Sequence, residues 1–113
     1  MAVQQQIPGL TRTDLQRHDL SVPGREVIQN SVEIDPDAPP IRHWHPGEEI
    51  IYVIDGTLEY EIDGEEAQTV GARGALTVPA ERVHSVRNVG DGSATELATY
   101  VVEKDKPLLN LPT

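Results

Sequence analysis

Apolar and polar residues alternate in short stretches along most of this chain. Between Ile28 and Ile34 the even-numbered residues face one way and the odd-numbered polar residues face the other, which is the period of two that a half-buried β-strand produces. The stretch EIIYVID at 49–55 is apolar on both faces. That pattern predicts a strand with the core on one face and a partner surface on the other.

Turn residues end these stretches at short intervals. Proline, aspartate and glycine fall at 35–40, 46–47, 55–56 and 63–64, where they interrupt a sheet ladder or favour a tight hairpin. Further strands are expected at 41–45, 57–62, 66–70, 75–78, 83–89 and 95–103. No helical stripe of useful length occurs, so the predicted class is all-β, a sandwich or a barrel.

The first 26 residues show no sustained period of either kind. A disordered tail would leave the apolar side chains of Ile7, Leu10, Leu15 and Leu20 exposed to water. Their presence favours an irregular or edge-strand arm that packs on the rest of the domain. A disordered tail stays open as the alternative. We therefore expect one domain, divided into an arm at 1–26, a β-domain at 27–104 and a tail at 105–113.

Composition narrows the classes of partner. The 113 residues carry a formal net charge of −10, so nucleic acids and anionic membrane surfaces would be repelled. The chain has no cysteine, which excludes disulfides, thiolate ligands and cysteine nucleophiles. It also lacks an apolar run long enough to cross a membrane as a helix and a recognisable leader, so a cytoplasmic protein is expected.

Candidate chemistry is concentrated around two histidines. His43 and His45 stand at i and i+2 of an expected strand, so both rings leave the same face and can converge on one metal ion. Glu49 follows the Pro46-Gly47 turn, which can bring its carboxylate alongside the pair. A solvent-facing or structural pair remains the alternative, and spacing alone does not bring His84 to this group.

These residues carry a resemblance to the cupin superfamily. His43-Trp44-His45, three residues, Glu49, six residues and Gly56 resemble its first motif. Pro79, four residues, His84, three residues and Asn88 resemble its second. The resemblance implies a single-domain jelly-roll β-barrel.

In that family the positions of His43, His45, Glu49 and His84 hold one divalent transition metal. Iron, manganese, nickel, cobalt, copper and zinc all suit three imidazoles and a carboxylate. Resemblance to small quercetin-dioxygenase-like cupins implies a dioxygenase acting on a small enol, diketone or phenolic substrate, with Glu49 leaving the metal to act as a catalytic base. Two alternatives remain: a Lewis-acid isomerase, decarboxylase or lyase, and a non-catalytic sensor or storage module that binds a small ligand.

The family likeness also suggests residues around the site. Tyr60, Val86 and Leu97 are candidates for the barrel interior and for substrate contact, with ordinary core packing as the alternative. Asp37, Arg73 and Glu81 stand where the motifs usually have glycine, which implies a cost in backbone strain of about 1–2 kcal/mol wherever a left-handed conformation is needed.

A homodimer is expected. The two-sided apolar stretch at 49–55 needs a cover on its outer face, and cupins of this size usually pair their barrels. A monomer with the N-terminal arm folded over that face is the alternative.

Overall fold

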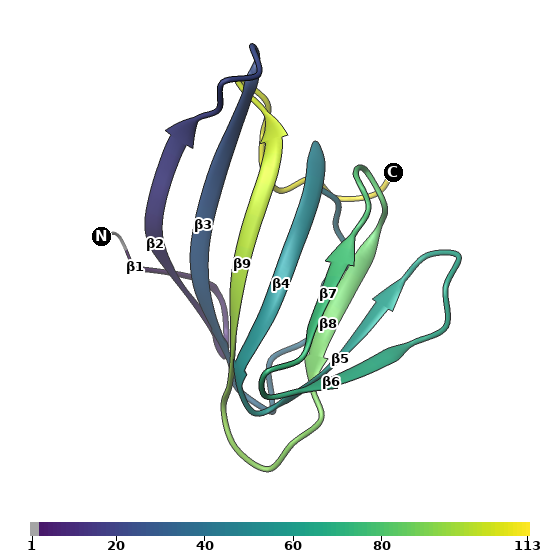
Figure 1. Cartoon of the computed structure of the whole chain (residues 1–113). Coiled ribbons are helices and arrows are strands. Elements are labelled where there is room, and N and C mark those ends of the chain that lie inside the picture. The colour runs from purple at the N-terminus through teal and green to yellow at the C-terminus, as the bar shows by residue number, and fades with distance from the viewer. Residues whose placement is uncertain (1–2) are drawn as a thin grey trace.

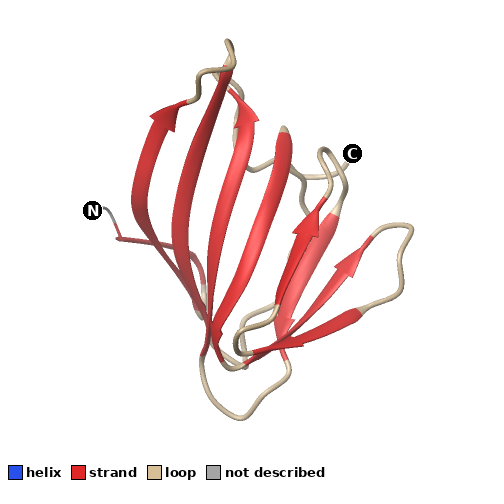
Figure 2. Ribbon diagram, in the orientation of Figure 1, coloured by secondary structure: helices blue, strands red, loops and turns tan. Residues whose placement is uncertain are grey.

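The computed structural model describes residues 3–113, and over this range the protein consists of strands and loops, with no helix (Figure 2). It therefore contains no helix that could cross a membrane within those residues. The strands are β1 (Val3–Ile7), β2 (Leu10–Asp19), β3 (Arg25–Ile34), β4 (Gly47–Asp55), β5 (Thr57–Ile62), β6 (Gln68–Gly71), β7 (Ala75–Val78), β8 (His84–Asn88) and β9 (Ala94–Glu103).

The strands form two antiparallel sheets. The larger has the order β1-β2-β3-β9-β4-β7 and the smaller has the order β6-β5-β8. Figure 1 shows the long strands β2, β3, β9 and β4 side by side in a curved layer, with β5, β6 and β8 lying across one end of it. The predicted all-β class is confirmed.

The core lies between the sheets and comes from alternate residues. In β9 every second residue from Ala94 to Val102 is buried, and in the second half of β3 Asn30, Val32 and Ile34 are buried while the residues between them are more exposed. This matches the period of two predicted for 28–34. The buried apolar residues include Ile51 and Val53 of β4, Leu58 and Ile62 of β5, and Val78 of β7.

The N-terminal arm is a regular part of the larger sheet. Strand β2 pairs with β3 along its whole length, and β1 pairs with β2 at the sheet edge. The arm therefore consists of edge strands, and the expectation of an irregular arm is wrong. Because β3 begins at Arg25, the expected boundary at residue 26 falls inside a strand.

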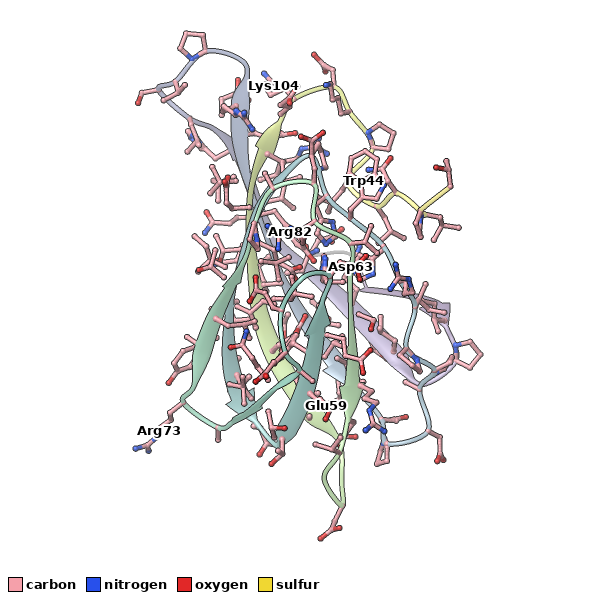
Figure 3. All side chains as sticks on the ribbon, turned by 90° about the vertical axis from the view of Figure 1, so that its right-hand side faces the viewer. Trp44, Glu59, Asp63, Arg73, Arg82 and Lys104 are labelled. Carbon is pink, nitrogen blue, oxygen red and sulfur yellow. The ribbon has the colours of Figure 1, made fainter. Side chains whose placement is uncertain are left out.

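The expected strand at 41–45 is wrong. His43 and Trp44 make isolated bridges to His84 and Asn110, and no ladder forms. The prolines at 39, 40 and 46 flank this segment and cannot donate to one. Figure 3 shows Trp44 beside the C-terminal tail, which supplies the Asn110 bridge.

Strand β4 is buried on one face only. Glu49, Ile51 and Val53 point into the core. Ile50, Tyr52 and Ile54 on the other face are 46%, 42% and 49% exposed. The outer face predicted to meet a partner is therefore open in the single chain.

Four positions test the motif glycines. Gly56 has φ +85°, and an added Cβ would lie 2.5 Å from the Ala94 Cβ, so both backbone and space require glycine. Arg73 and Glu81 have φ of 72° and 61°, so the strain expected from replacing glycine is present at both. Asp37 is not in the left-handed region and carries no such strain.

Candidate metal centre

A backbone bridge joins the two histidine segments. The His43 N–H donates to the His84 carbonyl at 3.0 Å, and the His84 N–H donates to the His43 carbonyl at 2.9 Å. His84 opens β8, His43 and His45 lie in the loop before β4, and Glu49 is the third residue of β4. This bridge brings His84 to the other three, which sequence spacing could not do.

The four side chains meet in the barrel interior. One ligand atom from each of His43, His45, Glu49 and His84 lies within 4.8 Å of all the others. His45, Glu49 and His84 are 2–3% exposed, and His43 is half-buried. The centroid of the His43 ring lies 4.9 Å from that of His45 and 4.3 Å from that of His84.

Each histidine ring is oriented by a backbone carbonyl. The Nδ1 atoms of His43, His45 and His84 lie 2.7, 2.8 and 2.9 Å from the carbonyl oxygens of Ile41, Leu108 and Arg82 respectively. A carbonyl only accepts, so each Nδ1 carries the proton and donates it. In the neutral ring the lone pair is then on Nε2, as is typical of metal-binding histidines held by outer hydrogen bonds.

The converging atoms fit a cation. His45 Nε2 lies 3.2 Å from Glu49 Oε1, yet it is fully buried and has no hydrogen-bond partner in the part of the chain described. Two facing acceptors without a proton between them are unfavourable unless a positive charge joins them. Three imidazole nitrogens and one carboxylate oxygen therefore make a set suited to a divalent transition metal.

The charges of the metal-free site follow from its contacts. Burial alone would raise the pKa of Glu49, but its close contacts with His45 and His84 outweigh burial and hold that pKa far below its usual value. Burial lowers the pKa of His43 to about 4. Burial would also lower the pKa of His84, but its 3.1 Å contact with Glu49 raises it. Glu49 is thus an anion and His43 is neutral at pH 7, which is the state that metal binding requires.

A second buried carboxyl lies in the same interior. Glu96 of β9 is 4% exposed and accepts a 2.6 Å hydrogen bond from the Tyr60 hydroxyl. Burial, followed by the nearby charge of Glu49, raises the pKa of Glu96 to about 8. Burial and Glu96 also raise the pKa of Tyr60. Glu96 is therefore a neutral acid at pH 7.

Sequence reasoning missed Glu96. The sequence shows Glu96 only as a single carboxylate in the alternating series Ala94, Glu96, Ala98, Tyr100. The other face of β9 carries Leu97 and Val101, so the sequence does not decide which face of this strand is buried. The structure places Leu97 on the outer face, opposite Tyr52 and Ser31, so its predicted place in the interior is wrong.

A small hollow lies beside the ligand set. It has a volume of about 40 Å³, and Glu49, His43 and His84 line it together with Tyr60, Glu96, Val86 and Arg12. An adjoining, mostly apolar hollow, which we call the mouth, shares Leu10, Arg12, His43 and Val86 with the first. Its other lining residues are Ile7, Pro39, Ile41 and Leu109. Tyr60 and Val86 therefore lie where substrate contact was expected, and contact itself stays a prediction.

Comparison with known families decides the identity of the fold. The cupin domain model matches residues 30–102. The chain belongs to the cupin family. This cupin also resembles solved cupin structures, so the predicted jelly-roll barrel is confirmed. KdgF from Halomonas sp. superposes with a TM-score of 0.73 at 22% identity, covering 93% of this chain and 91% of that one.

Two further matches are proteins named for polyketide synthesis. The polyketide synthase CurC of Streptomyces cyaneus is 43% identical over 53 residues, which are 46% of this cupin and 34% of that protein, so the match spans about a third of CurC. The polyketide cyclase RemF of Streptomyces resistomycificus has a TM-score of 0.69 at 22% identity, covering 95% of this cupin and 73% of RemF. At that identity the RemF likeness establishes the fold alone.

Proposed function

We propose that this cupin is a metal-dependent enzyme that closes a ring in a small poly-β-ketone by an aldol-type condensation. The observation that carries the proposal is a neutral buried acid, Glu96 with Tyr60, in the same hollow as a four-ligand metal set. The likeness to CurC and RemF supports the same substrate class. A bound divalent metal would supply Lewis-acid polarisation of a carbonyl group.

The chain's own residues handle the protons in this proposal. With a pKa of about 8, Glu96 can give a proton to a developing alkoxide or enol near neutral pH and take one back afterwards. The Tyr60 hydroxyl, 2.6 Å away, holds the carboxyl in place. Glu49 stays a candidate base, but its lowered pKa makes it a weaker one than Glu96.

The surroundings suit a partly apolar substrate. Leu10, Ile41 and Val86 line the mouth, and closing them around a ligand would exclude water from the carbonyl groups. The cytoplasmic location and the participation of Val86 in binding stay predictions.

Dioxygenase chemistry is the second candidate. Three imidazoles and one carboxylate suit iron, copper, manganese and nickel as well as zinc, and an enol or diketone could be cleaved at the same site if a redox metal is bound. The third possibility, a sensor or storage module, uses the same ligand set without turnover.

Heptane-2,4,6-trione provides a direct test of ring closure. Attack of one terminal methyl carbon on the far carbonyl forms a carbon–carbon bond, the methyl proton passes to the base, and the carbonyl oxygen leaves as water, giving 3,5-dihydroxytoluene. Zinc-loaded protein in an anaerobic chamber should accelerate this product, measured by liquid chromatography. His45→Ala should lose both the metal, by elemental analysis, and the acceleration, whereas Glu96→Gln should keep the metal and lose about 100-fold in rate.

Other outcomes select the alternatives. Oxygen consumption by iron-loaded protein with diketones, together with an inert anaerobic sample, would support the dioxygenase. Tight binding with no turnover under either condition would support the storage or sensor module.

A further inference from the structure

Arg12 is a half-buried cation on the inner face of the larger sheet. It lies on β2 opposite Val32, a core residue of β3, so its side chain shares the inner face of the sheet. It lines both the inner hollow and the mouth, together with the metal-ligating His43. Its Nε atom is buried and makes no hydrogen bond within the described part of the chain.

The other cations of this acidic chain are mostly satisfied. Six of the nine lysines and arginines form ion pairs, namely Arg17, Arg42, Arg82, Arg87, Lys104 and Lys106. Arg25 donates to the Pro46 carbonyl. Arg73 projects from the β6–β7 turn into solvent, away from the barrel, as Figure 3 shows. Arg12 is thus the one arginine or lysine that lines the hollow beside the metal ligands.

Neither carboxyl group of the inner hollow forms an ion pair with Arg12 among the described residues. Glu49 lines that hollow but pairs with His45 and His84. Glu96 lies on the same rung of the sheet, reached through Val32, and the charge of Arg12 lowers the pKa of Glu96 less than burial and Glu49 raise it. The raised pKa of Glu96 keeps that carboxyl neutral. An unpaired buried N–H of a charged group is costly, and a bound anion would remove the cost.

We propose that Arg12 binds a carboxylate group of the substrate while the dicarbonyl part of the same molecule lies at the metal-ligand set. A guanidinium matches a carboxylate through two parallel hydrogen bonds, and Nε is one of the donors suited to that geometry. The substrate class is then a β-dicarbonyl acid: a carboxylate, an apolar link that contacts Leu10 and Val86, and two ketone oxygens. The dicarbonyl part of this inference rests on the proposed function, and the carboxylate part does not.

The test compares two ligands that differ in the carboxylate. Zinc-loaded protein is titrated by calorimetry with 4,6-dioxoheptanoate and with heptane-2,4-dione, which has the same diketone and no acid. Wild type should bind the acid at least about ten-fold more tightly, as one charged hydrogen-bonded pair implies. Arg12→Gln should weaken the binding of the acid and leave the binding of the dione unchanged, so that the two ligands bind equally. Unchanged dione binding also shows that this variant is folded. Arg73→Gln, the matched exposed control, should behave as wild type.

The remaining outcomes separate the two claims. Equal binding of acid and dione by wild type, or an undiminished preference in Arg12→Gln, would overturn the role of Arg12 and leave the proposed function standing. If the dione fails to bind while 4,6-dioxoheptanoate and hexanoate both bind and both depend on Arg12, the carboxylate site is upheld and the dicarbonyl proposal fails.

Discussion

At the scale of single residues, Glu96 shows how a fold can change the chemistry of a side chain. A carboxyl in water ionises well below neutral pH, but this one is surrounded by core residues and lies near the anion of Glu49. The Tyr60 hydroxyl donates a hydrogen bond to it, which only partly offsets the effect of burial on its pKa. Glu96 therefore keeps its proton at a pH where exposed carboxylates have lost theirs.

This raised pKa predicts a pH-dependent stability. Between about pH 4.5 and 8 the folded state holds a proton on Glu96 that the unfolded state has released, so the free energy of unfolding contributed by this group falls as pH rises. Urea unfolding of metal-free protein at pH 5 and pH 8 should show that the free energy of unfolding falls less between these two pH values in Glu96→Gln than in wild type. Glu61→Gln, an exposed change on β5, should match wild type, and equal losses in all three proteins would contradict the pKa.

Sequence reasoning worked for residues whose spacing is a motif and failed for residues whose role depends on packing. His43, His45, Glu49 and His84 were found because their spacing resembles a known pattern. Glu96 and Arg12 were missed because a lone charged residue in a short strand gives no spacing, and its face is decided only by the neighbouring strands. Leu97 was misplaced for the same reason.

At the scale of elements, the contact between β4 and β9 determines the position of Glu49. Gly47 opens β4 against Val102, and a Cβ on it would overlap the Val101 carbonyl oxygen. Glycine is needed here for close approach of two backbones. Glu49 follows two residues later, so the approach of the strands sets the depth of a candidate metal ligand.

Gly47→Ala should therefore reduce both stability and metal affinity. Overpacking of this kind costs about 1–3 kcal/mol of unfolding free energy, and moving β4 away from β9 would shift the Glu49 carboxylate. Thermal unfolding and competition with a zinc chelator measure the two effects. Gly71→Ala in β6, where an added Cβ meets nothing within 4 Å, is the control and should change stability by less than about 1 kcal/mol. A Gly47→Ala variant that matches the control would contradict this account.

The elements themselves were largely predictable, with two exceptions. The strands from β3 to β9 follow alternation and turn residues that are visible in the sequence. The N-terminal strands β1 and β2 were not, because Arg12 and Asp14 occupy inward positions of β2 and break the apolar period. The segment 41–45 failed because flanking prolines prevent a ladder.

At the scale of the whole molecule, the open face of the larger sheet contrasts with the rest of the surface. The chain carries a net charge of −10, yet Ile50, Tyr52 and Ile54 of β4 expose apolar side chains beside Leu97 of β9. A second copy would present the same apolar residues and bury them, with the exposed Glu48 at the margin of the patch. The predicted homodimer would use this surface.

Light scattering can test the dimer. Wild type should have a mass of twice 12.4 kDa, and Tyr52→Arg should have the mass of a single chain because a charge would be buried unpaired. Thr69→Arg, exposed on β6 in the smaller sheet, should leave the dimer intact. A wild-type mass of 12.4 kDa would contradict the expectation.

The carbonyl groups that orient the three histidines have an evolutionary consequence. Because His43, His45 and His84 are held by main-chain oxygens of residues 41, 82 and 108, the side chains at those positions can be exchanged without removing a hydrogen bond to the rings. Ile41 also lines the mouth. A mutation at position 41 can therefore change the lining of the mouth and keep the carbonyl that orients His43, so the hollow can vary by single steps while the geometry of the histidines persists.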